Sequence, residues 1–163
     1  MENIYLMKNK IKIVISSIFL IIIDIIIKLI VSNKLIFNQS IKVINNFFYI
    51  TYVKNTGVAW SMLSGKINLI VVLTLIIILL LIVYLFKKEN YNKYEIIGYS
   101  LLLSGAIGNL IDRIIYGYVI DYLDFRILGY NYPIFNMADM CIVIGLVLII
   151  IFGGKYGNSS RNE

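Results

Sequence analysis

The sequence predicts an α-helical membrane protein with four transmembrane helices and a small β-rich platform outside the membrane, between the first two helices. Two observations lead to this class. Of the 163 residues, 60% are hydrophobic and only 15% are charged, which is more apolar surface than a soluble domain of this length can bury. The apolar residues also gather in four runs of about 20 residues each, long enough to cross a hydrocarbon core of about 30 Å.

The four runs define the expected spans of a single integral membrane domain that covers residues 1–163. We expect these spans at residues 11–31, 67–86, 95–115 and 134–152. The first run follows three lysines, as in a secretory signal peptide. It is too long for such a segment and lacks a small-x-small cleavage site, so we expect a retained helix.

The lysines and arginines beside the spans predict the orientation of the chain. They lie before the first span, between the second and third, and after the fourth, at Lys8, Lys10, Lys12, Lys87, Lys88, Lys93, Lys155 and Arg161. Positive residues in short loops mark the cytoplasmic side. Both termini are therefore expected in the cytoplasm, and segments 32–66 and 116–133 outside, although four lysines in the first of these segments oppose the rule.

The first external segment has the composition of short strands. It is rich in β-branched and aromatic residues, and "YITYV" alternates, which favours strands at the outer membrane boundary with Asn55-Thr56-Gly57 as their turn. Trp60, together with residues 47–49, suits an interfacial aromatic belt.

Composition also excludes several classes of function. The chain has no histidine and one cysteine, which removes Ser-His-Asp and Cys-His catalysis, histidine-based metal sites and an intrachain disulfide. We expect Cys141 to be a packed thiol, and we expect no metal and no cofactor. The net charge of +6 is interpreted as a signal for membrane orientation rather than for nucleic-acid binding, because the sequence has no basic arm.

Charged residues inside the first span need an explanation. Asp24 and Lys28 are four residues apart, so they share one helical face in the favourable order for an ion pair. A charge at the bilayer centre costs about 2.5–3.5 kcal/mol on insertion scales, which favours mutual pairing. The pair is either purely structural or one wall of a functional site.

The third span carries a polar face of small residues. Gly105, Gly108, Asn109 and Asp112 follow the i, i+3, i+4, i+7 pattern. Small residues permit close helix contact, and the amide and carboxylate must then face protein or water. We expect Asp112 and its neighbour Arg113 to form a self-neutralising structural network.

Topology brings a candidate pair of carboxylates to one side of the membrane. Asp139 and Asn136 share a face at the start of the fourth span, where they either cap the helix or belong to a functional site. Asp121 lies in the external segment before it. Two close carboxylates share a proton, so the ionised one can activate water while the protonated one polarises a carbonyl. We expect Asp124 to be a solvated loop residue.

These motifs together resemble the bacterial lipoprotein signal peptidases, the signal peptidase II family of aspartyl membrane proteases. The resemblance covers nearly the whole chain and follows the blocks "DIIIK", "NTGVAWSML", "GAIGNLIDR", "GYVIDY" and "FNMAD". It implies that Asp121 and Asp139 are catalytic. The implied supporting or substrate-binding residues are Asp24, Lys28, Asn55, Gly57, Gly105, Asn109, Asp112, Arg113, Asn136 and Ala138. Ser104 and Tyr122 are mild departures from the family pattern.

The resemblance implies an enzyme that removes the signal peptide from diacylglyceryl-modified prolipoproteins and cuts before the lipid-bearing cysteine. It implies membrane lipid as a partner, a cyclic peptide inhibitor as a candidate ligand, no nucleic acid and a monomer in the bacterial cytoplasmic membrane. The alternative is a small proton-coupled transporter, which would explain Asp24 and Asp112 but not two aspartates at a single face. A structural assembly subunit would explain none of the polar residues.

Overall fold

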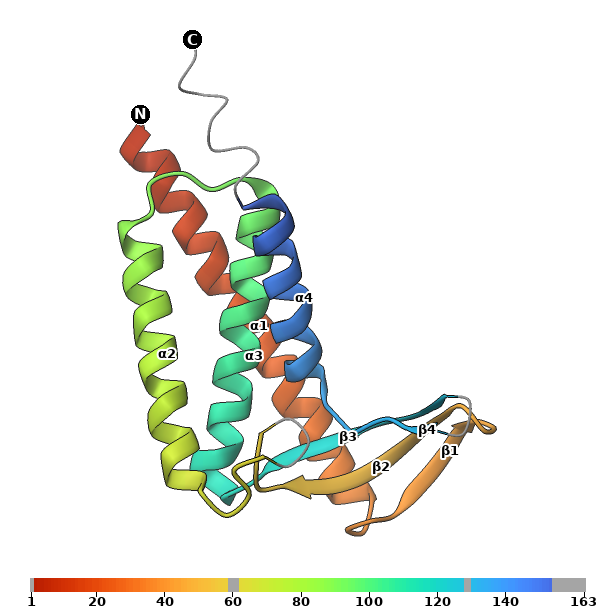
Figure 1. The fold of residues 1–163 in the computed structure, drawn as a ribbon. Helices are drawn as coiled ribbons and strands as arrows, with labels where there is room; N and C mark the ends of the chain where they lie inside the picture. Colours follow the sequence, from red (N-terminus) through yellow and green to blue (C-terminus); the bar gives the residue numbers. More distant parts are fainter. Residues whose placement is uncertain (1, 59–61, 128–129, 154–163) are drawn as a thin grey trace.

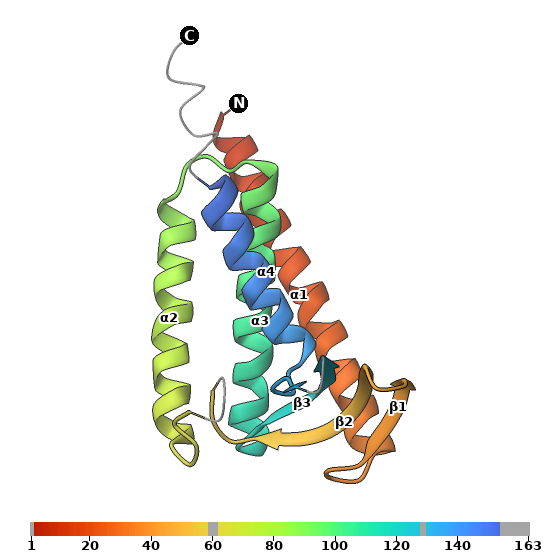
Figure 2. The same ribbon diagram turned by 45° about the vertical axis from the view of Figure 1, so that its right-hand side comes forward.

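The computed structural model describes residues 2–58, 62–127 and 130–153. Trp60, expected in an aromatic belt, lies outside these residues. Four helices run side by side, and a small sheet lies across one end of the bundle (Figure 1, Figure 2). The start of the first helix, the α2–α3 connection and the end of the last helix lie at the opposite end, which we call the lysine end.

The helices occupy the predicted runs, with some differences at their ends. They are α1 (Glu2–Lys34), α2 (Ile67–Lys87), α3 (Lys93–Tyr116) and α4 (Met137–Phe152). Among the described residues, three helices are long and apolar enough to cross a membrane: Met7–Lys34, α2 and α3. The fourth helix is apolar but has 16 residues. It begins later than predicted because Asn136 caps its first turn, so residues 134–136 remain extended.

The third helix is the centre of the bundle, because it packs against each of the other three helices. Its contact with α4 depends on glycine. A Cβ atom at Gly105 would clash with the carbonyl oxygen of Ala138 and would lie 2.8 Å from Cγ1 of Ile142. The predicted close helix contact at this small residue is therefore confirmed.

The sheet is antiparallel and has the order β1-β2-β3-β4. Its strands are β1 (Ser40–Ile44), β2 (Phe48–Asn55), β3 (Val119–Ile127) and β4 (Tyr130–Asn131). The prediction of a platform between the first two helices is thus incomplete, since β3 and β4 follow α3. Hydrogen bonding between β2 and β3 joins segments 32–66 and 116–133 into one sheet.

The predicted turn at Asn55-Thr56-Gly57 is wrong. The turn between β1 and β2 lies at residues 45–47, where Asn46 adopts a positive φ of 55°, a conformation that asparagine tolerates. Asn55 instead ends β2, opposite Val119 of β3. The sequence contains turn formers at both places, and only strand pairing distinguishes them.

One buried stripe of α1 anchors the sheet to the bundle. Val31 of α1 and Leu35, the residue directly after this helix, pack against Tyr52 of β2 and against Ile120 and Tyr122 of β3. The end of α1 therefore holds β3 in place, and β3 in turn carries Asp121.

Candidate active site

A buried ion-pair cluster joins α1 to α3 below the sheet. The Lys28 ammonium lies 2.7 Å from Oδ2 of Asp24 and 2.9 Å from Oδ2 of Asp112, and it donates to Oδ1 of Asn109 at 3.1 Å. All four side chains are buried. The predicted Asp24–Lys28 pair is confirmed. The predicted pairing of Asp112 with Arg113 is wrong, because Lys28 from another helix is the charge partner of Asp112.

Gly108 makes room for this cluster. A Cβ atom at this position would lie 2.7 Å from Oδ2 of Asp24. The absence of a side chain therefore lets the α1 carboxylate approach the backbone of α3. The helical pattern places Gly108 on the polar face but does not indicate this contact, because the contact depends on the packing of two helices that are distant in sequence.

Arg113 tethers the segment that follows β2. Its Nη2 donates to the carbonyl oxygen of Gly57 at 2.9 Å, and its Nη1 donates to the carbonyl oxygen of Asn109. The N–H of Gly57 donates to Oδ1 of Asn55, and Nδ2 of Asn55 donates to Oδ2 of Asp121 at 2.9 Å. Residues 55–57 thus connect α3 to the β3 carboxylate.

Asn136 and Asp139 form the predicted cap of α4. Oδ1 of Asn136 accepts the N–H of Asp139 at 2.9 Å, and Oδ2 of Asp139 accepts the N–H of Asn136 at 3.1 Å. This reciprocal arrangement is a capping box. It fixes the Asp139 carboxylate at the helix N-terminus, where the helix dipole favours negative charge.

The same two residues also belong to the candidate site. Nδ2 of Asn136 donates to Oδ1 of Asp121 at 2.7 Å and to Oδ1 of Asn109 at 3.1 Å. Nδ2 of Asn109 donates to Oδ1 of Asp139 at 2.7 Å. Asn136 therefore bonds directly to both carboxylates, so the capping and functional interpretations of this pair are compatible.

Asp121 is the more buried of the two acids, since Asp139 is half-buried. Burial raises the pKa of Asp121 to about 7, and the nearby negative charge of Asp139 acts in the same direction. Hydrogen bonds from Asn55 and Asn136 and the charge of Lys28 oppose this rise in the pKa. Asp121 can therefore keep a proton near neutral pH while a neighbouring carboxylate is ionised.

The remaining predicted residues pack around this centre. Ala138 is buried against Gly105 of α3, and Cys141, one turn further along α4, is buried as expected. A contact that the sequence did not indicate comes from Tyr122, whose hydroxyl oxygen accepts the N–H of Met137 at 3.2 Å. Among the described residues, no group of three or more acidic or cysteine side chains is arranged to hold a metal ion.

The prediction that Asp124 is solvated is wrong. Its side chain is buried on β3, where Oδ2 accepts a hydrogen bond from Thr51 Oγ1 at 2.7 Å and lies 3.2 Å from Nη2 of Arg126. The Arg126 guanidinium in turn covers the ring of Tyr49. Asp124 is buried because the segment after α3 forms a strand of the sheet rather than a loop. The hydrogen-bond and ion-pair partners of Asp124 are separate from those of Asp121 and Asp139.

Fold and site together define a multi-pass membrane protein with two hydrogen-bonded carboxylates at the sheet end of its bundle. The family model described as signal peptidase (SPase) II matches residues 16–155. The lipoprotein signal peptidase of Staphylococcus haemolyticus is 41% identical over 158 residues, which cover 95% of this chain and 100% of the relative. That of Staphylococcus aureus strain JH9 is 41% identical over 135 residues, or 83% of each chain.

Two solved structures of bacterial membrane enzymes have a similar fold. A bacterial membrane enzyme determined at 2.3 Å resolution is 37% identical, with a TM-score of 0.81 over 93% of both chains. Another, determined at 1.9 Å, is 39% identical, with a TM-score of 0.78 over 88% of this chain and 93% of that chain. The protein belongs to the signal peptidase II family, and the resemblance predicted from its five sequence blocks is confirmed.

Proposed function

We propose that this protein is an aspartic-type endopeptidase that removes the signal peptide from prolipoproteins. Its substrate carries a diacylglyceryl-modified cysteine, and cleavage occurs directly before that cysteine. The names of the relatives at 41% identity support the substrate class. The observation that supports the chemistry is the pair of hydrogen bonds by which Asn136 connects Asp121 to Asp139.

The environments of the two carboxylates suggest different roles. Asp121 is buried and its pKa is raised to about 7, so it is the acid that donates a hydrogen bond to the scissile carbonyl oxygen. Asp139 is half-buried at a helix N-terminus, and its carboxylate takes a proton from the attacking water. The water oxygen then bonds to the carbonyl carbon, and the proton on Asp139 passes to the amine that leaves when the C–N bond breaks.

Lys28 orients this machinery through Asn109. An ammonium group can only donate hydrogen bonds, so the Asn109 atom that faces Lys28 must be oxygen. The amide nitrogen of Asn109 must then point toward Oδ1 of Asp139. Asp24 and Asp112 are both paired with Lys28, which weakens the transporter alternative that relied on them.

We also propose that the active site lies on the extracytoplasmic side, with both termini in the cytoplasm and all four helices spanning the membrane as one domain. The lysine-rich end of the bundle lies opposite the sheet, in agreement with the positive-inside rule. Arg113 and the segment at Gly57 would hold the substrate backbone over the carboxylates. The enzyme is expected to act as a monomer in contact with lipid.

Two isosteric substitutions test the proposal. Asp121→Asn and Asp139→Asn should each reduce cleavage of a diacylglyceryl prolipoprotein in liposomes by at least about 10²-fold, the lower bound for loss of an acid or base. Asp124→Asn is the matched control, because Asp124 is an aspartate buried on the same strand as Asp121. Full cleavage by either active-site variant would contradict the assignment. Loss of cleavage in the control would mean that the wrong carboxylates were paired.

A further inference from the structure

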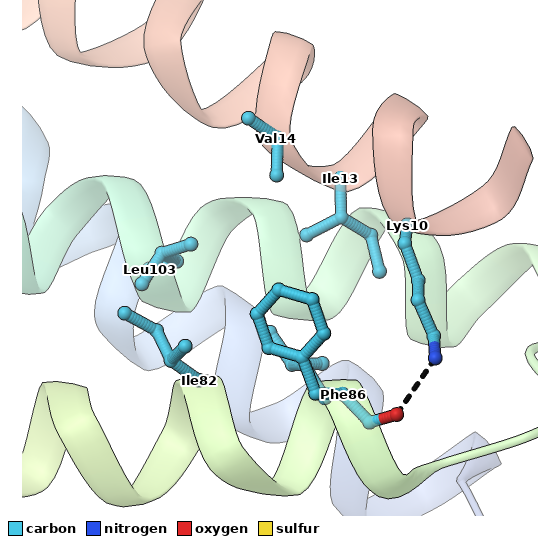
Figure 3. A pocket seen from close by; sticks show the side chains of 7 residues that line it. Lys10, Ile13, Val14, Ile82, Phe86 and Leu103 are labelled. Atoms are coloured by element: carbon cyan, nitrogen blue, oxygen red, sulfur yellow. Dashed lines mark hydrogen bonds between the residues drawn. The ribbon is translucent and has the colours of Figure 1, made fainter. Parts of the chain in front are cut away.

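A lateral groove lies at the lysine end of the bundle, away from the candidate active site. It encloses about 270 Å³ between α1, α2 and α3 (Figure 3) and is lined by Lys10, Ile13, Val14, Ile82, Leu85, Phe86 and Leu103. Its floor is buried, whereas Val14 at its rim is 50% exposed and Phe86 is 72% exposed. The groove therefore opens sideways onto the apolar surface of the helices.

The shape of the bundle creates this groove. α1 approaches α2 at the lysine end and diverges from it toward the sheet (Figure 1, Figure 2). The floor consists of Ile13, Leu85 and Leu103, one residue from each of the three helices. In a membrane, a groove with such a lining is filled by hydrocarbon, because water would find few polar partners there.

A cation is held at the mouth of the groove. The Lys10 ammonium donates to the carbonyl oxygen of Phe86 at 2.7 Å (Figure 3). This hydrogen bond uses one of the three ammonium N–H groups. It keeps the charge beside the apolar lining instead of allowing the side chain to extend away into water.

The surroundings of the mouth are also basic. Three further lysines lie on the same two helix ends and are exposed: Lys8, Lys12 and Lys87. Of the acids whose side chains are described, two lie near this end: Glu95 on α3 is buried and paired with Lys88 at 3.1 Å, and Glu89, two residues after the end of α2, is exposed. The lysines at this end outnumber these acids, so the net charge that an occupant of the groove meets at its mouth is positive.

We propose that this groove binds an anionic phospholipid of the membrane, with one acyl chain between α1 and α2 and the phosphate at Lys10. The apolar lining selects the chain, and the lysines select the negative headgroup at the depth where headgroups lie. The volume is below the range of about 300–1,000 Å³ that is usual for compact small-molecule sites, so the groove has room for part of one chain, and the rest of that chain continues into the surrounding lipid. This site is separate from the proposed peptidase centre and does not depend on its activity.

The test measures lipid binding by the purified full-length protein in detergent. Native mass spectrometry would compare phosphatidylglycerol with phosphatidylcholine of identical chains, and we expect phosphatidylglycerol to bind at least about fivefold more tightly. Lys10→Met should abolish this preference. Lys66→Met, at the sheet end of α2, is the matched control and should retain it. Equal binding of the two lipids, or a preserved preference in the Lys10 variant, would overturn the proposal.

A second variant tests the groove without removing the charge. Val14→Trp should fill the groove from its rim and weaken phosphatidylglycerol binding while Lys10 remains in place. This arm also keeps the proposal falsifiable if Lys10→Met fails to fold. Glycerophosphoglycerol, which has the headgroup but no acyl chains, should not displace the lipid. Displacement by this compound, or unchanged binding to the Trp variant, would show that the groove holds no chain.

Discussion

Replacement of Lys28 by methionine should be among the most damaging single substitutions in the bundle. The methionine side chain has similar length but carries no charge, so the apolar stem is retained while the ammonium is lost. The ammonium contacts Asp24, Asp112 and Asn109 within 3.1 Å, and its side chain is 2% exposed. Its removal leaves two carboxylates buried without their cation.

The size of the stability loss in Lys28→Met follows from the number of buried charges that are left unpaired. Removal of one partner from a buried ion pair costs about 3–5 kcal/mol, and Lys28 serves two partners, so we expect the upper part of this range. For a chain of this size, that loss corresponds to a decrease in melting temperature of about 6–20 °C. The amide of Asn109 also loses the contact that orients it toward Asp139, so cleavage should fall in the protein that remains folded.

The assay is thermal unfolding in detergent, followed by prolipoprotein cleavage well below the melting temperature. The matched variant combines Lys28→Met with Asp24→Asn and Asp112→Asn, which removes both uncompensated charges. It should recover most of the lost stability but not the cleavage rate, since Asn109 still lacks its lysine. A melting temperature of Lys28→Met within about 2 °C of the parent would refute the reasoning, as would a triple variant no more stable than the single one.

Three other predictions concern pH and helix packing. The pKa of Asp121 is raised to about 7, so its carboxyl group keeps a proton in the folded protein up to about that pH. Loss of this proton removes the hydrogen-bond donor and leaves a buried charge. Both the cleavage rate and the contribution of Asp121 to the free energy of unfolding should therefore decline as pH rises through that value. Asn55→Ala removes a hydrogen bond that lowers this pKa, and it should move the upper limb of the pH–rate profile to higher pH; an unchanged or lower limb would contradict this. Gly105→Ala places a methyl group against Ala138 and Ile142, and it should destabilise the α3–α4 contact by about 1–3 kcal/mol. Thermal unfolding measures this loss, and an unchanged melting temperature would show that the helices can separate at no cost.

The predictions that proved correct depend on relationships within one helix. The apolar runs located all four helices, because each run is continuous in sequence. The Asp24–Lys28 pair and the Asn136–Asp139 capping box span four and three residues, which helical geometry brings together whatever the rest of the chain does. The packing role of Gly105 follows from the same periodicity.

The predictions that failed depend on contacts between parts of the chain that sequence periodicity does not relate, and most of these parts lie far apart. Lys28 and Asn109 are 81 positions apart, and Thr51 and Asp124 are 73 apart. A sequence pattern shows which face of an element a residue occupies but not which element lies opposite that face. The partner of Asp112, the burial of Asp124 and the entry of β3 into the sheet were therefore beyond sequence periodicity.

The sequence by itself determined the membrane class, the helices and the identity of the acidic residues that could form a site. Tertiary structure alone decided that Asn136 bonds to Asp121, 15 positions earlier, as well as to its helical neighbour Asp139. The physical reason is that helical hydrogen bonding fixes neighbours three or four residues apart, whereas the Asp121–Asn136 contact requires α1 and α3 to position β3 beside the start of α4.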